Sequence, residues 1–294
     1  MRFSRLLLTI ASIIWSLAMP LFLTACGKRP APADSSGVAT GWLGEAAGFD
    51  VLLITLDTVR ANRLGCYGYP SAATGSVDSL CNPGVRFDSA FSSVPLTLPS
   101  HATILTGRYP MEHGVRDNGL FKLDTVETSI AERLKSAGYD TAAFIGSFVL
   151  DQRFGLAQGF DLYDFEVSPQ GIKPQMVDFN ERSAQDVTDS YLRWLGERTA
   201  GKAATPYFAW LHYFDPHQPY SSPFVFEGRF TGHPYDAEIA YVDHHLGRIL
   251  TTLEGLGTRR RTLILLTADH GESLGEHGED THGIFIYDAT IRCL

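Results

Sequence analysis

Three continuous apolar runs in the chain predict buried strands. They are residues 51–56 (VLLITL), 207–214 (YFAWLHYF) and 262–267 (TLILLT). An unbroken apolar run is typical of a strand that is covered on both faces of a parallel sheet, whereas a half-exposed strand alternates. Residues 85–91 and 139–145 show weaker patterns of the same kind, so they are further strand candidates.

Helical periodicity separates these runs. Apolar residues recur at helical spacing in two segments, at Ile239, Val242, Leu246, Leu250 and Leu253 and at Val187, Tyr191 and Leu195. A shorter helix is predicted over residues 125–135. Strands that alternate with helices predict an α/β fold with a doubly wound, mostly parallel sheet and helices on both faces.

Acidic residues and histidines follow each strong strand. Asp57 ends the first run, Asp215 and His217 follow the second, and Asp269 and His270 follow the third. In an open α/β sheet the carboxyl ends of the strands share one crevice, so these residues are expected to converge. A single Asp in such a place is commonly a turn residue or a helix N-cap. Three strands in succession that end this way indicate a metal site instead.

The ligand types narrow the choice of metal. Carboxylate and imidazole without thiolate suit zinc or manganese, or calcium and magnesium with more oxygen ligands, and the histidines favour one or two zinc ions. The loop HGEDTHG adds His277 and His282, and its glycines at 271, 275, 278 and 283 would let it fold back over the site. We expect His282 to be the ligand of the two.

The segment TLPSHATILTG, residues 97–107, concentrates polar groups before a predicted helix over residues 100–105 that has Pro99 at its start. Thr97 would then stand just before a helix N-terminus, where free N–H groups favour an anion. Its hydroxyl is either a helix cap or a nucleophile activated by the metal.

The first 26 residues have the layout of an export signal. Arg2 and Arg5 precede the apolar run 6–23, which ends in Leu-Thr-Ala-Cys26. This tetrad resembles the bacterial lipobox, so we expect a signal peptide over 1–26, a lipidated Cys26, a flexible linker over 27–48 and a catalytic domain over 49–294. An uncleaved membrane anchor is the alternative. Both place the domain on the periplasmic or outer side of a membrane.

Composition limits the partners. The 294 residues carry a formal charge of −9, which gives no basic surface for nucleic acid. Cys66 and Cys81 are compatible with a disulfide or with two free thiols.

Longer motifs reveal a family resemblance. They are VLLITLDTVR with GCYGYP, TLPSHATILTGRYP with EHGVRDNG, HYFDPHQPY, YDAEIAYVDHHLGRIL and LLTADHGESLGEHG. The chain resembles the N-terminal part of a sulfatase-like member of the alkaline phosphatase superfamily, without that family's smaller C-terminal subdomain. The resemblance implies metal-dependent attack of a hydroxyl on a sulfate or phosphate ester, through a covalent enzyme intermediate.

The chain departs from active sulfatases at the nucleophile. Thr97 and His101 stand where sulfatases carry the Cys or Ser and the Arg of C/S-x-P-x-R, and oxidation of threonine would give a ketone rather than formylglycine. Thr58 replaces a second aspartate, and a sulfate-binding segment is replaced around residues 145–148. The threonine branch of the superfamily is similar in its T-x-P-x-H and in its DHGESLGE.

That branch implies the site residues. One zinc maps onto Asp57, Thr97, Asp269 and His270. A second metal, or the cations that steady the leaving group, draws on His217 and His282, with Asp215 as a further candidate, and the catalytic pair is Thr97 and His101. We assign substrate contacts to Asn118 and Asp215. The expected activity is hydrolysis of a small-molecule or headgroup phosphate mono- or diester in preference to a sulfate ester. The alternatives are a phosphotransferase similar to phosphoethanolamine transferases and a truncated, non-catalytic protein.

Overall fold

The computed structural model describes residues 46–165, 181–201 and 205–294. The predicted signal peptide over 1–26 and nearly all of the linker over 27–48 lie outside the described residues. Within the described ranges, no helix has the length and apolarity that a membrane crossing requires.

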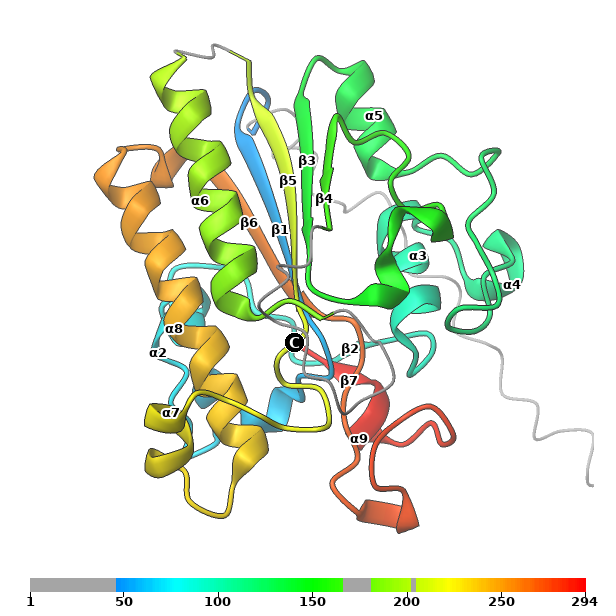
Figure 1. Cartoon of the computed structure of the whole chain (residues 1–294), viewed down its shortest axis with the longest axis vertical. Coiled ribbons are helices and arrows are strands. Elements are labelled where there is room, and N and C mark those ends of the chain that lie inside the picture. The colour runs from blue at the N-terminus through cyan, green and yellow to red at the C-terminus, as the bar shows by residue number, and fades with distance from the viewer. Residues whose placement is uncertain (1–45, 166–180, 202–204) are drawn as a thin grey trace, which may run out of the picture. The chain divides into compact units, whose positions relative to one another are not determined.

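A five-stranded parallel sheet forms the centre of the fold (Figure 1), in the order β4-β3-β5-β1-β6. Its strands are β1 (Asp50–Leu56), β3 (Asp140–Ile145), β4 (Leu162–Asp164), β5 (Tyr207–Tyr213) and β6 (Thr262–Ala268). The three strong apolar runs are therefore the three neighbouring strands β5, β1 and β6, as predicted. A separate antiparallel pair joins β2 (Ala90–Phe91) to β7 (Arg292–Cys293).

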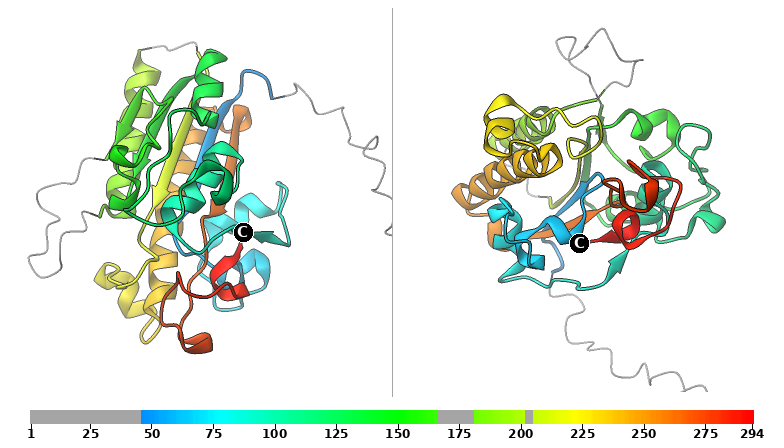
Figure 2. Two further views of the ribbon diagram at one scale, coloured as in Figure 1. Left: turned by 90° about the vertical axis from the view of Figure 1, so that its right-hand side faces the viewer. Right: turned by 90° about the horizontal axis from the view of Figure 1, so that it is seen from below.

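Helices cover both faces of the sheet, which confirms the doubly wound fold class. The α-helices are α2 (Gly75–Cys81), α3 (Thr97–Thr106), α4 (Pro110–His113), α5 (Ile130–Ser136), α6 (Ala184–Ala200), α7 (Phe224–Arg229), α8 (Pro234–Gly255) and α9 (Asp288–Ile291). Figure 2 shows α3 on the opposite side of the sheet from α6 and α8.

Strand alternation assigns the buried side chains to two cores. Leu52, Ile54 and Leu56 of β1 pack in the core under α6 and α8, whereas Leu53 packs with α3 and α5. On β5, Ala209 and Leu211 face α6 and α8, and Phe208 and Trp210 face α3. Because successive side chains point to opposite faces, Thr55 and His212 must also face α3.

Three local predictions need correction. Of the candidate strand over 85–91 only Ala90–Phe91 is extended, because Val85 and Phe87 lie exposed outside the sheet. The helix predicted over 125–135 begins at Ile130, since Ser129 caps it in a capping box with Glu132. Thr97 is the first residue of α3, with Leu96 as the N-cap, rather than a residue before the helix.

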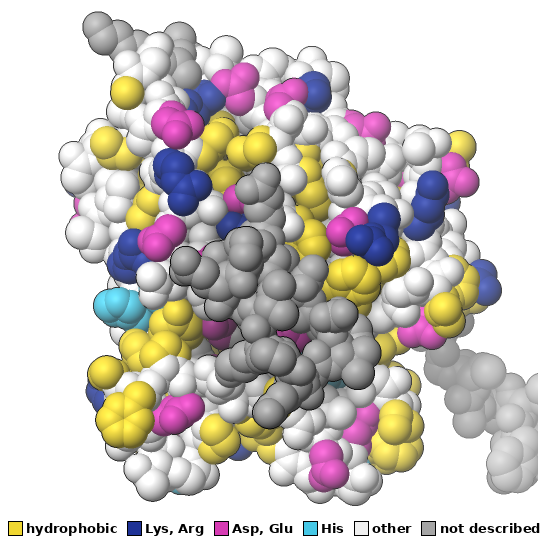
Figure 3. Space-filling model, viewed as in Figure 1, with side chains coloured by type: hydrophobic (Ala, Val, Ile, Leu, Met, Phe, Trp, Pro, Cys, Tyr) yellow, Lys and Arg dark blue, Asp and Glu magenta, His cyan; other side chains and the backbone are white. Residues whose placement is uncertain are grey.

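The surface carries mixed charge. Figure 3 shows basic and acidic side chains interspersed on the face it displays, without a patch of one sign. The Cys66 and Cys81 thiols are free and partly buried. Burial raises the pKa of Cys66 to about 12, which keeps it a thiol at neutral pH.

Candidate active site

The carboxyl ends of β1 and β6 place Asp57, Asp269 and His270 together. One ligand atom from each lies within 4.8 Å of the others, and all three side chains are fully buried. His270 Nε2 is 3.7 Å from Asp57 Oδ1 and 3.4 Å from Asp269 Oδ2. Adjacent parallel strands end at one edge of the sheet, so the predicted convergence of these three residues is observed.

Three of the four carboxylate oxygens of Asp57 and Asp269 lack a hydrogen bond within the described ranges. Neither oxygen of Asp57, nor Oδ2 of Asp269, has a partner among the described residues. Burial raises the pKa of both carboxyls well above their usual range, and the charge of Asp57 raises that of Asp269 further. Buried, unpaired and mutually repelling carboxylates are what a divalent cation would compensate. The donor set therefore fits a metal ion.

A strained residue borders this cluster. Thr58 has φ 58°, a left-handed conformation that is rare for a β-branched side chain. Its N–H donates to Asp269 Oδ1 at 3.2 Å and its hydroxyl to the Pro216 carbonyl at 2.8 Å. Tyr235 donates its hydroxyl hydrogen to the Thr58 carbonyl at 2.6 Å. The strain thus serves to direct a backbone donor at a carboxylate of the cluster.

Thr97 enters the cluster from α3. Its Oγ1 lies 3.3 Å from His270 Nε2, and its side chain is buried. Ser100 ties the helix to the end of β6 by donating to the Asp269 carbonyl at 2.6 Å. Asn118 accepts the Leu98 N–H at 2.9 Å, so its amide oxygen secures the first turn of α3.

His217, His270 and His282 each hydrogen-bond to a backbone carbonyl through Nδ1. His270 Nδ1 lies 2.9 Å from the Gly271 carbonyl, His282 Nδ1 3.0 Å from the Pro95 carbonyl, and His217 Nδ1 2.5 Å from the Gln218 carbonyl. A carbonyl only accepts, so each Nδ1 carries the hydrogen and each neutral ring keeps a lone pair on Nε2. Backbone carbonyls thereby fix the same tautomer in all three rings, with the lone pair on Nε2.

Two of these lone pairs face each other. His217 Nε2 and His282 Nε2 are 3.0 Å apart, although neither carries a hydrogen in the neutral tautomers just described. Burial, then the neighbouring His282, lowers the pKa of His217 to about 4. Such a pair is stable when it shares a cation, either a proton or a metal ion. His277 lies apart, exposed and stacked on Tyr287 with ring centroids 3.7 Å apart.

Asp215 has different surroundings. Burial raises the pKa of its carboxyl to about 7, an effect that the backbone of Ala184, the first residue of α6, partly offsets. It is not among the groups of side chains close enough to share a metal ion. Its proposed substrate contact stays a prediction.

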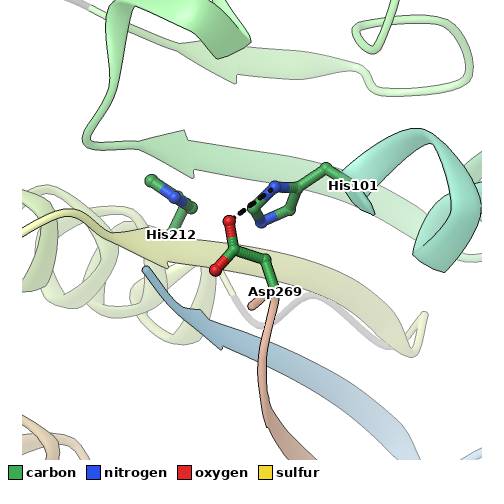
Figure 4. Close-up of side chains that lie close together, drawn as sticks. All are labelled: His101, His212 and Asp269. Atoms are coloured by element: carbon green, nitrogen blue, oxygen red, sulfur yellow. Dashed lines mark ion pairs between the residues drawn. The ribbon is translucent and has the colours of Figure 1, made fainter. Parts of the chain in front are cut away.

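His212 belongs to the site but was missed by sequence reasoning. It lies on β5 facing α3, fully buried, with Nε2 3.3 Å from Asp57 Oδ2. Neither ring nitrogen has a hydrogen-bond partner among the described residues, and burial lowers its pKa to about 3. Figure 4 shows His212, His101 and Asp269 directed toward one another from β5, α3 and the end of β6. The run YFAWLHYF suggested only a buried strand. The alternation of side chains along that strand was the one signal that could have placed His212 on the face of the site.

His101 lies behind the nucleophile candidate. Its ring is fully buried, with Nδ1 3.6 Å from Asp269 Oδ2 and an edge contact to His212 at 4.9 Å between centroids. Burial and then His212 lower the pKa of His101 well below its usual range, so the ring is neutral.

Comparison with known proteins agrees with this architecture. The family model described as Sulfatase matches residues 50–286. An ulvan-active sulfatase of Formosa agariphila is 26% identical over 264 residues, which cover 77% of this chain and 51% of that protein. N-acetylgalactosamine-6-sulfatase of Rattus norvegicus is 26% identical over 76% of this chain and 50% of its own. The chain thus spans about half the length of these curated relatives.

The fold is also found in solved structures. The phosphonate monoester hydrolase of Agrobacterium radiobacter superposes with a TM-score of 0.70 at 23% identity, over 83% of this chain and 67% of that one. At this identity the likeness concerns the fold.

Proposed function

The chain belongs to the sulfatase family, and from this premise we propose that it is a metal-dependent ester hydrolase in which Thr97 is the nucleophile. The observation that carries the proposal is the position of the Thr97 hydroxyl, 3.3 Å from His270 Nε2, which itself lies 3.7 Å from Asp57 Oδ1 and 3.4 Å from Asp269 Oδ2, two oxygens without a hydrogen bond in the described part of the chain. A hydroxyl aimed at a set of metal ligands is the arrangement that nucleophilic catalysis by an alcohol requires.

The metal-binding residues in this proposal are Asp57, Thr97, Asp269 and His270. A divalent ion, zinc by the donor types, would lower the pKa of the Thr97 hydroxyl and offset negative charge as it develops. Asp57 and Asp269 supply negative charge, His270 a fixed lone pair, and Thr58 holds Asp269 in place through its N–H.

Thr97 Oγ1 forms a bond to the phosphorus or sulfur atom of the ester while the bond to the leaving oxygen breaks. The hydroxyl proton passes to solvent and the departing alkoxide takes a proton from water. A second water then releases phosphate or sulfate from Thr97. In this proposal His217 and His282, whose facing lone pairs need a cation, would hold a second metal ion or a proton that steadies the leaving group.

We favour a phosphate ester over a sulfate ester for two chemical reasons. Threonine cannot be converted to formylglycine, and neutral His101 stands where sulfatases place arginine. A phosphate monoester is a dianion at neutral pH whereas a sulfate monoester is a monoanion, so divalent ions suit the phosphate monoester better. Transfer of the phospho-group to a second alcohol is the alternative fate of the intermediate.

Two variants of Thr97 test the nucleophile. Thr97→Val keeps the shape without the hydroxyl, and Thr97→Ser keeps the hydroxyl. Aryl phosphate, aryl phosphodiester and aryl sulfate are compared as substrates in zinc, manganese and calcium. We expect turnover with Ser at position 97 and none with Val, while both bind metal, and an acid-quenched phospho-enzyme only where a hydroxyl is present. Equal turnover of the Val variant and the wild type would exclude Thr97 as the nucleophile.

A further inference from the structure

A chain of three hydrogen bonds runs behind Thr97 through side chains that the proposed reaction does not use. Trp210 Nε1 lies 3.0 Å from Thr55 Oγ1, and Thr55 Oγ1 lies 3.0 Å from His101 Nε2. His101 Nδ1 then lies 2.8 Å from the carbonyl oxygen of Thr97. Trp210, Thr55 and His101 are fully buried, so no water competes for these bonds.

The direction of every bond in the chain is determined by its two ends. The indole N–H of Trp210 only donates, and the Thr97 carbonyl only accepts. His101 must therefore carry its hydrogen on Nδ1, and its Nε2 accepts the hydroxyl hydrogen of Thr55. Trp210 donates to the oxygen of the same hydroxyl. The four groups are mutually satisfied when the Thr55 hydroxyl hydrogen goes to His101 Nε2 at 3.0 Å rather than to the Leu211 carbonyl at 3.5 Å.

The register of β1 and β5 brings the residues of this hydrogen-bond chain together. Leu53 and Thr55 of β1 pair with Trp210 and His212 of β5, and the alternation of each strand turns this group toward α3. The Trp210 ring also packs beside His101 at 5.4 Å between centroids, and the His212 ring meets it edge-on at 4.9 Å. His101 is thus clamped by rings as well as by hydrogen bonds.

We propose that Trp210, Thr55 and His101 form a positioning device for the nucleophile. The device holds a neutral Nδ1–H tautomer of His101 on the Thr97 carbonyl and so fixes the first turn of α3, from which the Thr97 hydroxyl projects. It positions Thr97 without the permanent charge of the arginine that sulfatases carry at this place. The proposal rests on the proposed role of Thr97, and it makes His101 a positioning residue rather than a catalytic one.

The competing role for His101 is that of a metal ligand. His101, His212 and Asp269 have ligand atoms within 4.8 Å of one another. Coordination there would need the Nδ1 lone pair, because Nδ1 is the nitrogen 3.6 Å from Asp269 Oδ2. The ring would then give up its 2.8 Å bond to the Thr97 carbonyl, which would be left without this donor. The hydrogen-bond pattern therefore favours positioning.

Two amide variants separate the nitrogens of His101. His101→Asn presents an N–H near the place of Nδ1, whereas His101→Gln presents its amide near Nε2. We expect kcat to fall about 10- to 100-fold in His101→Gln and to recover partly in His101→Asn. KM should stay within about twofold, because substrate binding does not use this residue. The metal content of both variants, read by elemental analysis, should equal that of the wild type.

Removing the Thr55 hydroxyl tests whether the hydrogen bonds beyond His101 contribute to positioning. Thr55→Val deletes the hydroxyl at constant shape, and we expect kcat to fall about tenfold. Thr188→Val is the matched control, because Thr188 is equally buried and its hydroxyl bonds to Tyr213 at 2.7 Å on the other face of the sheet. It should lose comparable thermal stability without loss of kcat. Equal kcat in Thr55→Val and Thr188→Val would overturn the proposal.

An activity-independent readout completes the test. In a long-range nitrogen–proton NMR spectrum, the His101 signal, identified by its loss in His101→Asn, should show the Nδ1–H tautomer with and without zinc. An Nε2–H tautomer, or a zinc-dependent change of Nδ1 together with loss of zinc in His101→Asn, would refute positioning and make His101 a ligand. If wild type hydrolyses none of the esters, the proposed function fails and the positioning role falls with it, while the spectrum still reports the tautomer.

Discussion

Asp57→Asn should change stability in opposite directions with and without metal. In the metal-free domain, Asp57 is fully buried, neither of its oxygens has a partner among the described residues, and its charge raises the pKa of Asp269. Asparagine removes the charge and offers an N–H to the lone pair of His270 Nε2, which lies 3.7 Å from Asp57 Oδ1. An unsatisfied buried polar group costs about 1–3 kcal/mol. We therefore expect the metal-free variant to gain about 2 kcal/mol.

The assay is thermal unfolding at neutral pH, in chelator and in excess zinc. At about 2–4 °C per kcal/mol, the variant should melt about 4–8 °C above wild type in chelator. Zinc at about 1,000 times its Kd stabilises wild type by about 4 kcal/mol, and most of this should be lost in the variant. Asp189→Asn is the control, since Asp189 is a partly exposed partner of Arg248 and its substitution should change neither melting temperature much. A variant that melts below wild type in chelator, or keeps the zinc shift, would refute the metal assignment of Asp57.

Three further predictions follow from the site and its surroundings. Burial raises the pKa of Glu238 to about 9, so the stability that its protonated form contributes is fully present below pH about 4.5 and is lost as pH rises toward 9. In urea unfolding, Glu238→Gln should therefore raise the free energy of unfolding by up to about 3 kcal/mol at pH 7 and leave it unchanged at pH 4. Equal effects at the two pH values would contradict this prediction. His282→Ala should lower kcat/KM at least about tenfold in ester hydrolysis, whereas His277→Ala, an exposed ring in the same loop, should not; similar losses in both would argue for a general effect of the loop. Cys26→Ser should abolish incorporation of labelled fatty acid in bacterial cells, and persistent labelling would rule out Cys26 as the lipidated residue.

Particular residues show how far sequence patterns reach. Asp57, Asp269 and His270 were predictable, because each directly follows a strong apolar run and parallel strands end at one edge. The sequence also favoured His282 over His277 as a metal ligand, which stays a prediction; His282 contacts His217, whereas His277 stacks on Tyr287. His212 was not recognised as a site residue, because in a strand that is apolar on both faces the sequence does not show which positions face the site.

The amino-acid sequence by itself determined the fold class, the family and the edge of the sheet where the chemistry gathers, because apolar periodicity and strand-end residues act locally along the chain. Tertiary structure alone decided which face each strand residue occupies and which nitrogen of each histidine carries hydrogen. The first depends on strand register and the second on polar groups that include distant ones, such as the Pro95 carbonyl for His282 and the Thr55 hydroxyl for His101. The sequence therefore predicts which residue types form the site, whereas only the folded domain shows the directions of its hydrogen bonds.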